Sequence, residues 1–127
     1  MTEEWRDWLE LSGFQLREAR AALAAGSYLM AVFAAHQIAE KALKAVWIVA
    51  GDGLPPRSHN LVELGEGVKA PPSILDSCRL LNPLYLASRY PDAANGNPVK
   101  NYTPAMASVF LDSAEEVLQW CSSQQPS

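Results

Sequence analysis

The longest apolar stretch of the chain, at positions 27–50, is interrupted by one narrow set of polar side chains. At about 100° per residue, an α-helix places these polar side chains on a single arc of roughly 100° and covers the opposite side with apolar ones. A helix that is apolar over most of its circumference lies at the centre of a bundle or between two subunits. The pattern therefore predicts a central, largely buried helix with one polar stripe, which consists of Gln37, Glu40, Lys41 and Lys44.

Helical spacing also predicts a first helix over residues 3–25. Gly26 can end this helix in a left-handed conformation, and Ser27 can cap the central helix that follows. A connection this short makes the two helices antiparallel neighbours. The apolar face of the first helix is formed by Trp5, Trp8, Leu9, Ser12, Leu16, Ala19 and Leu23.

Glycines and prolines at positions 51–60 predict a surface loop after the central helix. Ser58 can cap a short helix over residues 59–68. A fourth helix is expected to open at the proline pair of positions 71 and 72 and to end at Tyr90, because Pro91 restricts the residue before it. Pro83 removes a backbone hydrogen bond within this pattern, so we expect a kink or break near Asn82.

The remaining sequence predicts a loop and a last helix. Residues 92–102 have loop composition throughout. Thr103 and Pro104 form a cap and first-turn pair, and the apolar face that follows extends to Cys121. We expect the tail CSSQQPS, at positions 121–127, to fray.

The predicted fold class is all-α. No stretch alternates with a period of two for long enough to make a convincing strand. We expect an antiparallel four-helix bundle with an additional short helix. At 127 residues the chain can bury a core of its own, so residues 1–127 should form a single domain with an ordered core at positions 3–121.

Charge and cysteine content narrow the functional classes. The net charge is −4 and both signs are interspersed, which argues against bulk DNA binding but allows a local basic site. Cys78 and Cys121 have no metal-like spacing and are expected to be reduced. The acidic N-terminus does not resemble a signal peptide, and no uncharged run reaches the length of a membrane span. We expect a cytoplasmic protein with no membrane anchor, metal or cofactor.

The polar stripe of the central helix has two interpretations. Glu40 and Lys44 form an i to i+4 pair in the favourable order, so the stripe can be a solvated edge, and spacing alone favours this view. The alternative is a groove or a subunit interface, where each buried charge needs a partner. Arg89 and Asp92 are the expected partners in that case.

Residues 88–92, with the sequence SRYPD, form a second candidate site. In the structural interpretation, Arg89 complements the dipole at a helix C-terminus, and Asp92 lies in the following turn. In the functional interpretation, Asp92 holds Arg89 as a phosphate-binding group, and Tyr90 stacks on a base.

Two histidines are further candidates. His36 lies on the central helix, where a lone histidine is usually a hydrogen-bonded core residue. His59 lies beside Arg57 in the loop and is the better functional candidate. It can act as a general base or bind phosphate, and it can equally cap the short helix.

Three motifs in this order, HQIAEKALKAV, SHNL and SRYPD, resemble the HEPN domain family over residues 9–118. The resemblance implies an antiparallel helical bundle, usually homodimeric and often paired with a minimal nucleotidyltransferase in prokaryotic toxin–antitoxin systems. It also implies a polar site at the matching positions, which are Gln37, Glu40, Lys41, Lys44, His59, Arg89, Tyr90 and Asp92.

Many members of this family are metal-independent ribonucleases that pair an arginine with a histidine four to six residues later. Here Arg89 matches the arginine, but Ala93, Ala94 and Asn95 occupy the positions of the histidine. The sequence therefore favours a homodimer that binds a nucleotide, an RNA end or a nucleotidyltransferase. The alternatives are a divergent ribonuclease that uses Arg89 with His59 or Asp92, and a structural module without a ligand.

Overall fold

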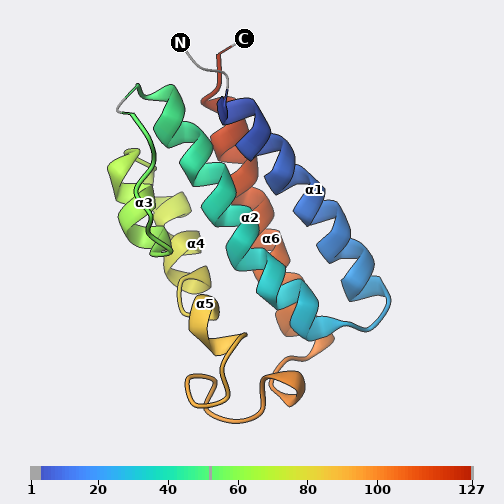
Figure 1. Cartoon of the computed structure of the whole chain (residues 1–127). Helices are drawn as coiled ribbons and strands as arrows, with labels where there is room; N and C mark the ends of the chain where they lie inside the picture. The colour runs from blue at the N-terminus through green and yellow to red at the C-terminus, as the bar shows by residue number, and fades with distance from the viewer. Residues whose placement is uncertain (1–3, 52, 127) are drawn as a thin grey trace.

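The computed structural model describes residues 4–51 and 53–126, which form six α-helices and one 3₁₀ turn (Figure 1). The described residues contain no strand, so the predicted all-α class is confirmed. None of the described helices is long and apolar enough to cross a membrane. In chain order the elements are α1 (Glu4–Ala24), α2 (Tyr28–Val49), α3 (Leu61–Gly67), α4 (Pro72–Leu81), α5 (Leu84–Ala87), η1 (Pro98–Lys100) and α6 (Pro104–Ser123).

The central position predicted for α2 is confirmed. Figure 1 shows α2 between α1 on one side and α3 to α5 on the other, with α6 behind it, and α2 packs against all of these helices. Alanines at positions 31, 35, 39, 42 and 45 are fully buried, and their small side chains allow neighbouring helices to approach closely. Because neighbours surround α2, polar residues on it are buried as well, including His36, Glu40 and Lys44.

Residues at the helix ends determine where the chain turns. Gly26 has a φ of 86°, the left-handed conformation expected for it. Thr103 caps α6, since its Oγ1 accepts a hydrogen bond from the backbone N–H of Met106 at 3.1 Å. Ser27 stands at the N-cap of α2 without a side-chain hydrogen bond.

The cap predicted for the short helix α3 is wrong. Asn60 caps it, because its Oδ1 accepts from the backbone N–H of Glu63 at 3.1 Å. Ser58 lies two residues earlier, and its Oγ accepts from the N–H of Asn60 at 3.0 Å. The helix starts only at Leu61, so Ser58 stabilises the loop that leads into it.

The break near Asn82 is confirmed, since α4 ends at Leu81 and α5 begins after Pro83. The end predicted at Tyr90 is too late, because α5 stops at Ala87. The Oγ of Ser88 donates to the carbonyl of Leu84 at 2.6 Å, and the chain then leaves the helix in a turn.

Two expectations for the C-terminal part are corrected. Residues 92–102 are not loop throughout, because Asn97 caps the 3₁₀ turn η1 by accepting from the N–H of Val99 at 3.1 Å. The tail does not fray at Cys121. This cysteine is fully buried, and α6 continues to Ser123.

Candidate functional site

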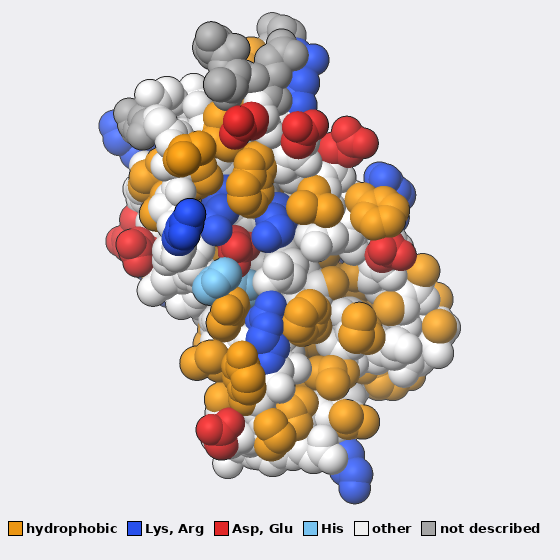
Figure 2. Space-filling view, in the orientation of Figure 1, with side chains coloured by type: hydrophobic (Ala, Val, Ile, Leu, Met, Phe, Trp, Pro, Cys, Tyr) orange, Lys and Arg blue, Asp and Glu red, His pale blue; other side chains and the backbone are white. Residues whose placement is uncertain are grey.

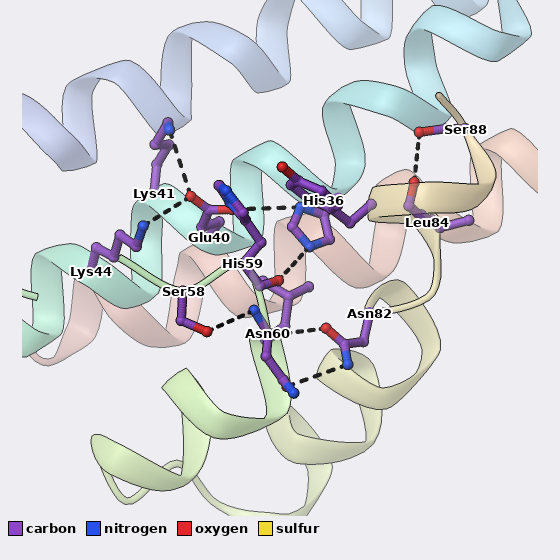
Figure 3. A network of polar contacts seen from close by, with 12 residues as sticks. His36, Glu40, Lys41, Lys44, Ser58, His59, Asn60, Asn82, Leu84 and Ser88 are labelled. Atoms are coloured by element: carbon purple, nitrogen blue, oxygen red, sulfur yellow. Dashed lines mark hydrogen bonds and ion pairs between the residues drawn. The ribbon is translucent and has the colours of Figure 1, made fainter. Parts of the chain in front are cut away.

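Glu40, near the middle of α2, is a buried carboxylate surrounded by cationic groups (Figure 3). Its side chain is only 2% exposed. The Oε2 atom accepts a hydrogen bond from Lys44 Nζ at 3.0 Å and lies 3.8 Å from Lys41 Nζ. The Oε1 atom lies 2.8 Å from Nδ1 of His59, in the loop before α3. The polar stripe is therefore not the solvated edge that spacing favoured, because neighbouring elements cover its centre.

The carboxylate of Glu40 is ionised. Burial, the largest single effect, raises the pKa of Glu40, but the hydrogen bonds from His59 and Lys44 and the charges of both lysines outweigh it, and the net shift is downward. An ionised carboxylate only accepts hydrogen bonds, so Nδ1 of His59 is the donor. One negative charge is thus shared between two nitrogen donors, with the ammonium group of Lys41 3.8 Å away.

His36 is fully buried one turn before Glu40 and holds the His59 loop. Its Nε2 lies 2.9 Å from the backbone carbonyl of His59, and a carbonyl can only accept, so Nε2 carries a proton. Burial lowers the pKa of His36 to about 4, which keeps the ring neutral near pH 7. Its Nδ1 has no hydrogen-bond partner and lies 3.8 Å from Oε1 of Glu40.

Asn82 holds the same loop from the opposite side (Figure 3). Its Oδ1 accepts from the backbone N–H of Leu61 at 2.8 Å, and its Nδ2 donates to Oδ1 of Asn60 at 3.3 Å. Asn82 follows α4 directly and precedes Pro83, so the break in this helix supplies the side chain that fixes the loop. His59 is consequently held by contacts on both flanks.

His59 remains accessible despite these contacts, with a side chain that is 50% exposed. Its ring stacks on Tyr85 with 4.2 Å between the centroids. Since Glu40 accepts the proton of Nδ1, the neutral ring has an unprotonated Nε2. No hydrogen bond to this atom occurs within the described part of the chain. A ligand can therefore use Nε2 as an acceptor or as a base.

Arg89 joins the site through aromatic rings and not through acids. Its guanidinium carbon lies 4.2 Å from the ring centroid of Tyr85 and 4.3 Å from that of Phe33. Its Nη1 also donates to the carbonyl of Tyr85 at 2.6 Å. The expected pairing of Arg89 with the polar stripe is replaced by a shared neighbour, because His59 and Arg89 both lie against Tyr85.

Three predicted site residues stay outside this arrangement. Gln37 lies on the α1 side of α2, where it lines a hollow of about 320 Å³. Tyr90 is 49% exposed, and Asp92 is exposed as well. Among the described residues, no hydrogen bond or ion pair connects Asp92 with Arg89. We call the connected residues the Glu40 cluster, which comprises His36, Glu40, Lys41, Lys44, His59, Tyr85 and Arg89.

Sequence reasoning missed two aromatic residues. It placed Tyr85 on the apolar face of the fourth helix and Trp8 on that of the first. The ammonium groups of Lys41 and Lys44 lie 5.5 and 5.8 Å from the ring centroid of Trp8. The position of Tyr85 four residues before Arg89, one helical turn away, is the only sequence signal that links it to the site.

Positive charge exceeds negative charge in the Glu40 cluster. Two lysines and Arg89 outnumber the single carboxylate, and protonation of His59 would add a further charge. Figure 2 shows basic side chains above and below the pale blue histidine, with one acidic side chain among them and hydrophobic side chains around. Across the residues that the structure describes, no three His, Cys, Asp or Glu side chains gather as possible metal ligands. The arrangement is suited to an anion.

The comparisons with known proteins agree with this fold. Over 98% of its length the chain is 32% identical to TT1696 from Thermus thermophilus, whose crystal structure is covered completely with a TM-score of 0.87. It is 33% identical to ST0689, an archaeal HEPN homologue, with 98% of each chain covered and a TM-score of 0.82. No curated protein sequence matches. The model of the HEPN domain matches residues 5–124, and the chain therefore belongs to the HEPN domain family.

Proposed function

We propose that the Glu40 cluster binds the phosphate group of a nucleotide or of an RNA end. The observation that carries this proposal is the excess of cationic groups around one buried carboxylate, which is 2% exposed and already accepts hydrogen bonds from two donors. A partly buried cationic excess attracts a counter-ion. Of the common biological anions, phosphate suits a guanidinium best, because its oxygens match the planar fork of donors.

The geometry around Tyr85 supports a common ligand for Arg89 and His59. The ring centroid of His59 and the guanidinium carbon of Arg89 each lie 4.2 Å from the Tyr85 centroid, so Tyr85 separates the two groups and a shared phosphate would reach them from the edge of its ring. The stacking contacts and the bond to the Tyr85 carbonyl hold the guanidinium in place before a ligand arrives. A group that is already ordered loses less conformational entropy on binding.

Calorimetric titration with 5′-AMP and with a short 5′-phosphorylated RNA tests the proposal and separates the two sources of phosphate. Replacing Arg89→Ala should weaken binding of the preferred ligand by about 10- to 100-fold, the usual value of hydrogen bonds to a charged group. Arg79→Ala is the matched control, because Arg79 is exposed on α4 and pairs with Asp76. Full retention of binding by Arg89→Ala would count against the proposal.

A divergent ribonuclease is the second candidate, and the pair of Glu40 and His59 favours it. A carboxylate that accepts from Nδ1 orients the imidazole and leaves Nε2 to take a proton from a ribose 2′-hydroxyl. Arg89 would then stabilise the charge that develops on the phosphate. Cleavage of RNA in the presence of EDTA that is lost in both His59→Ala and Arg89→Ala, and kept in Arg79→Ala, would establish this activity.

A homodimer is proposed as the assembly. Phe14 and Met30 are 48% and 58% exposed on α1 and α2, and a second copy would remove this apolar surface from water. Sedimentation of the native protein and of Phe14→Glu tests the interface, because a charge there should favour the monomer. If Lys41→Met and Arg89→Met are neutral in tests of ligand binding, RNA cleavage and partner binding, the Glu40 cluster is not a ligand site and the alternative of a purely structural dimer is favoured.

The family resemblance suggests a partner protein, and the two cysteines suggest a cellular location. A minimal nucleotidyltransferase in a toxin–antitoxin pair is the partner that the family resemblance suggests, and co-purification with the product of a neighbouring gene tests it. A cytoplasmic location is proposed because Cys78 and Cys121 are both unpaired thiols.

A further inference from the structure

We infer that Trp8 on α1 and the hollow beside it bind the planar base of a nucleotide. This inference rests on the proposed function, because it adds a base subsite to the phosphate subsite at the Glu40 cluster. Trp8 is partly buried and forms one wall of the hollow. The other walls are Asp7, Leu11 and Lys41, so the hollow and the cluster share a lysine.

The two subsites lie side by side. The ammonium groups of Lys41 and Lys44 are 5.5 and 5.8 Å from the Trp8 centroid, and both face the carboxylate of Glu40. Figure 3 shows both lysines extending from α2 toward that carboxylate. Lys41 is the more accessible of the two, with 20% of its side chain exposed, and a ligand whose phosphate contacts it has its remaining groups next to the indole. A nucleotide combines these two chemistries in one molecule.

The size and lining of the hollow indicate what it can take. Its volume is about 220 Å³, below the roughly 300–1,000 Å³ of pockets that enclose a complete drug-sized ligand. It can accept one ring system while the sugar and phosphate lie outside it. Leu11 is 41% exposed at its edge, so a bound base would also cover apolar surface.

Shielding of the lysines is the competing explanation for Trp8. An indole near two ammonium groups stabilises them through its π-electrons whether or not a ligand binds. That role predicts that loss of the ring weakens every anion equally. A base subsite predicts a selective loss, since a ligand without a base does not use the ring.

Titration of the native protein with 5′-AMP and with ribose 5-phosphate separates these roles, because the two ligands differ only in the base. Stacking on an aromatic ring should make 5′-AMP bind about 5- to 150-fold more tightly. Trp8→Leu should reduce the affinity for 5′-AMP to that for ribose 5-phosphate and leave the affinity for ribose 5-phosphate unchanged. Trp8→Phe, which keeps an aromatic ring, should preserve most of the preference. Trp120→Leu is the control for loss of a partly buried tryptophan elsewhere.

Equal affinities of the native protein for the two ligands would overturn the base subsite and leave phosphate binding intact. An equal loss for both ligands in Trp8→Leu would assign Trp8 to lysine shielding and also overturn it. If neither ligand binds the native protein, the base subsite and the phosphate subsite are both rejected. Circular dichroism of each variant establishes that it is folded, and the comparison of the two ligands on the native protein still tests the base subsite if Trp8→Leu is not.

Discussion

The stripe at residues 37–44 and the corner at residues 88–92 look alike in the sequence but differ in the fold. Each combines acidic and basic side chains at a helix position that suggests a site. The stripe lies in the middle of the bundle, where Glu40 is 2% exposed, accepts hydrogen bonds from two donors and has a third nitrogen 3.8 Å away. The corner is mostly exposed, and Arg89 alone connects to the site. The two regions differ in burial, because a buried charge needs a partner and an exposed charge does not.

The largest expected difference between the regions is in how far a substitution lowers the free energy of unfolding. Glu40→Gln leaves Lys44 without its counter-charge, although the Lys44 side chain is only 8% exposed. Removing one partner of a buried ion pair typically lowers the free energy of unfolding by about 3–5 kcal/mol. Urea unfolding monitored by circular dichroism measures this loss. A change below about 1 kcal/mol, the usual value of an exposed ion pair, would show that the stripe is solvated in solution.

The stripe should also make stability depend on pH. The pKa of His36 is lowered to about 4 by burial, so the unfolded chain binds the additional proton between about pH 6.5 and 4. Stability is therefore present above this window and falls with decreasing pH, by at most about 1.4 kcal/mol per pH unit. The carboxylate of Glu40, whose pKa is lowered, adds to the loss at the acidic end. Burial outweighs the hydrogen bond to the His59 carbonyl and the charge of Glu40, which both raise the pKa of His36, whereas the charges of Arg89 and His59 lower it.

Urea unfolding at several pH values, compared between the native protein and His36→Gln, isolates this contribution. Glutamine keeps a donor for the carbonyl of His59 but does not titrate. Its slope between about pH 6.5 and 4 should be the shallower one. Parallel slopes would assign the pH dependence to other groups.

A smaller effect is expected at Asn82, which lies between the two regions in the sequence and holds the loop that carries His59. Asn82→Ala removes the acceptor of the Leu61 N–H, which is 2.8 Å from Oδ1 in the native protein. Leaving a partly buried donor without a partner costs about 1–3 kcal/mol. Asn97→Ala removes a comparable but exposed bond at the start of η1, after the corner, and should cost less. Thermal unfolding of both variants gives the ranking, and equal losses would contradict it.

The smallest effect is expected for Asp92→Asn. Asp92 is exposed, and a surface substitution of this kind usually changes stability by less than about 0.5 kcal/mol. Binding of the phosphate ligand should also stay within about twofold in the titration used for Arg89→Ala. A loss of binding in Asp92→Asn would show that the corner is part of the binding site.

Local chemistry predicted the fold well. Proline at positions 72, 83 and 104, the left-handed Gly26 and the cap at Thr103 act within one turn of the chain, so the sequence alone placed the breaks between helices. The errors are also local. Ser58 and Asn60 are both good caps, and only the position of the helix start decides between them. The continuation of α6 beyond Cys121 depends on burial of this cysteine, which is a tertiary effect.

The sequence identified several residues of the candidate site but not the contacts between them. Glu40, Lys41, Lys44, His59 and Arg89 were named from the sequence, but their partners were not. The bond between Glu40 and His59 spans 19 positions, and that between His36 and the His59 carbonyl spans 23. Such contacts depend on how the loop after α2 folds back over this helix. Nothing in the spacing indicated that Tyr85 would lie between His59 and Arg89.

The excess of positive charge in the Glu40 cluster has a practical use in finding a ligand. A molecule that binds only the folded chain raises its melting temperature, and at about one hundred times the dissociation constant it stabilises the fold by about 2.7 kcal/mol. The contacts of Glu40 join α2 to a loop that follows it, so the cluster exists only when the chain is folded. Thermal-shift screening against a panel of anions can therefore rank ligands before any activity is known.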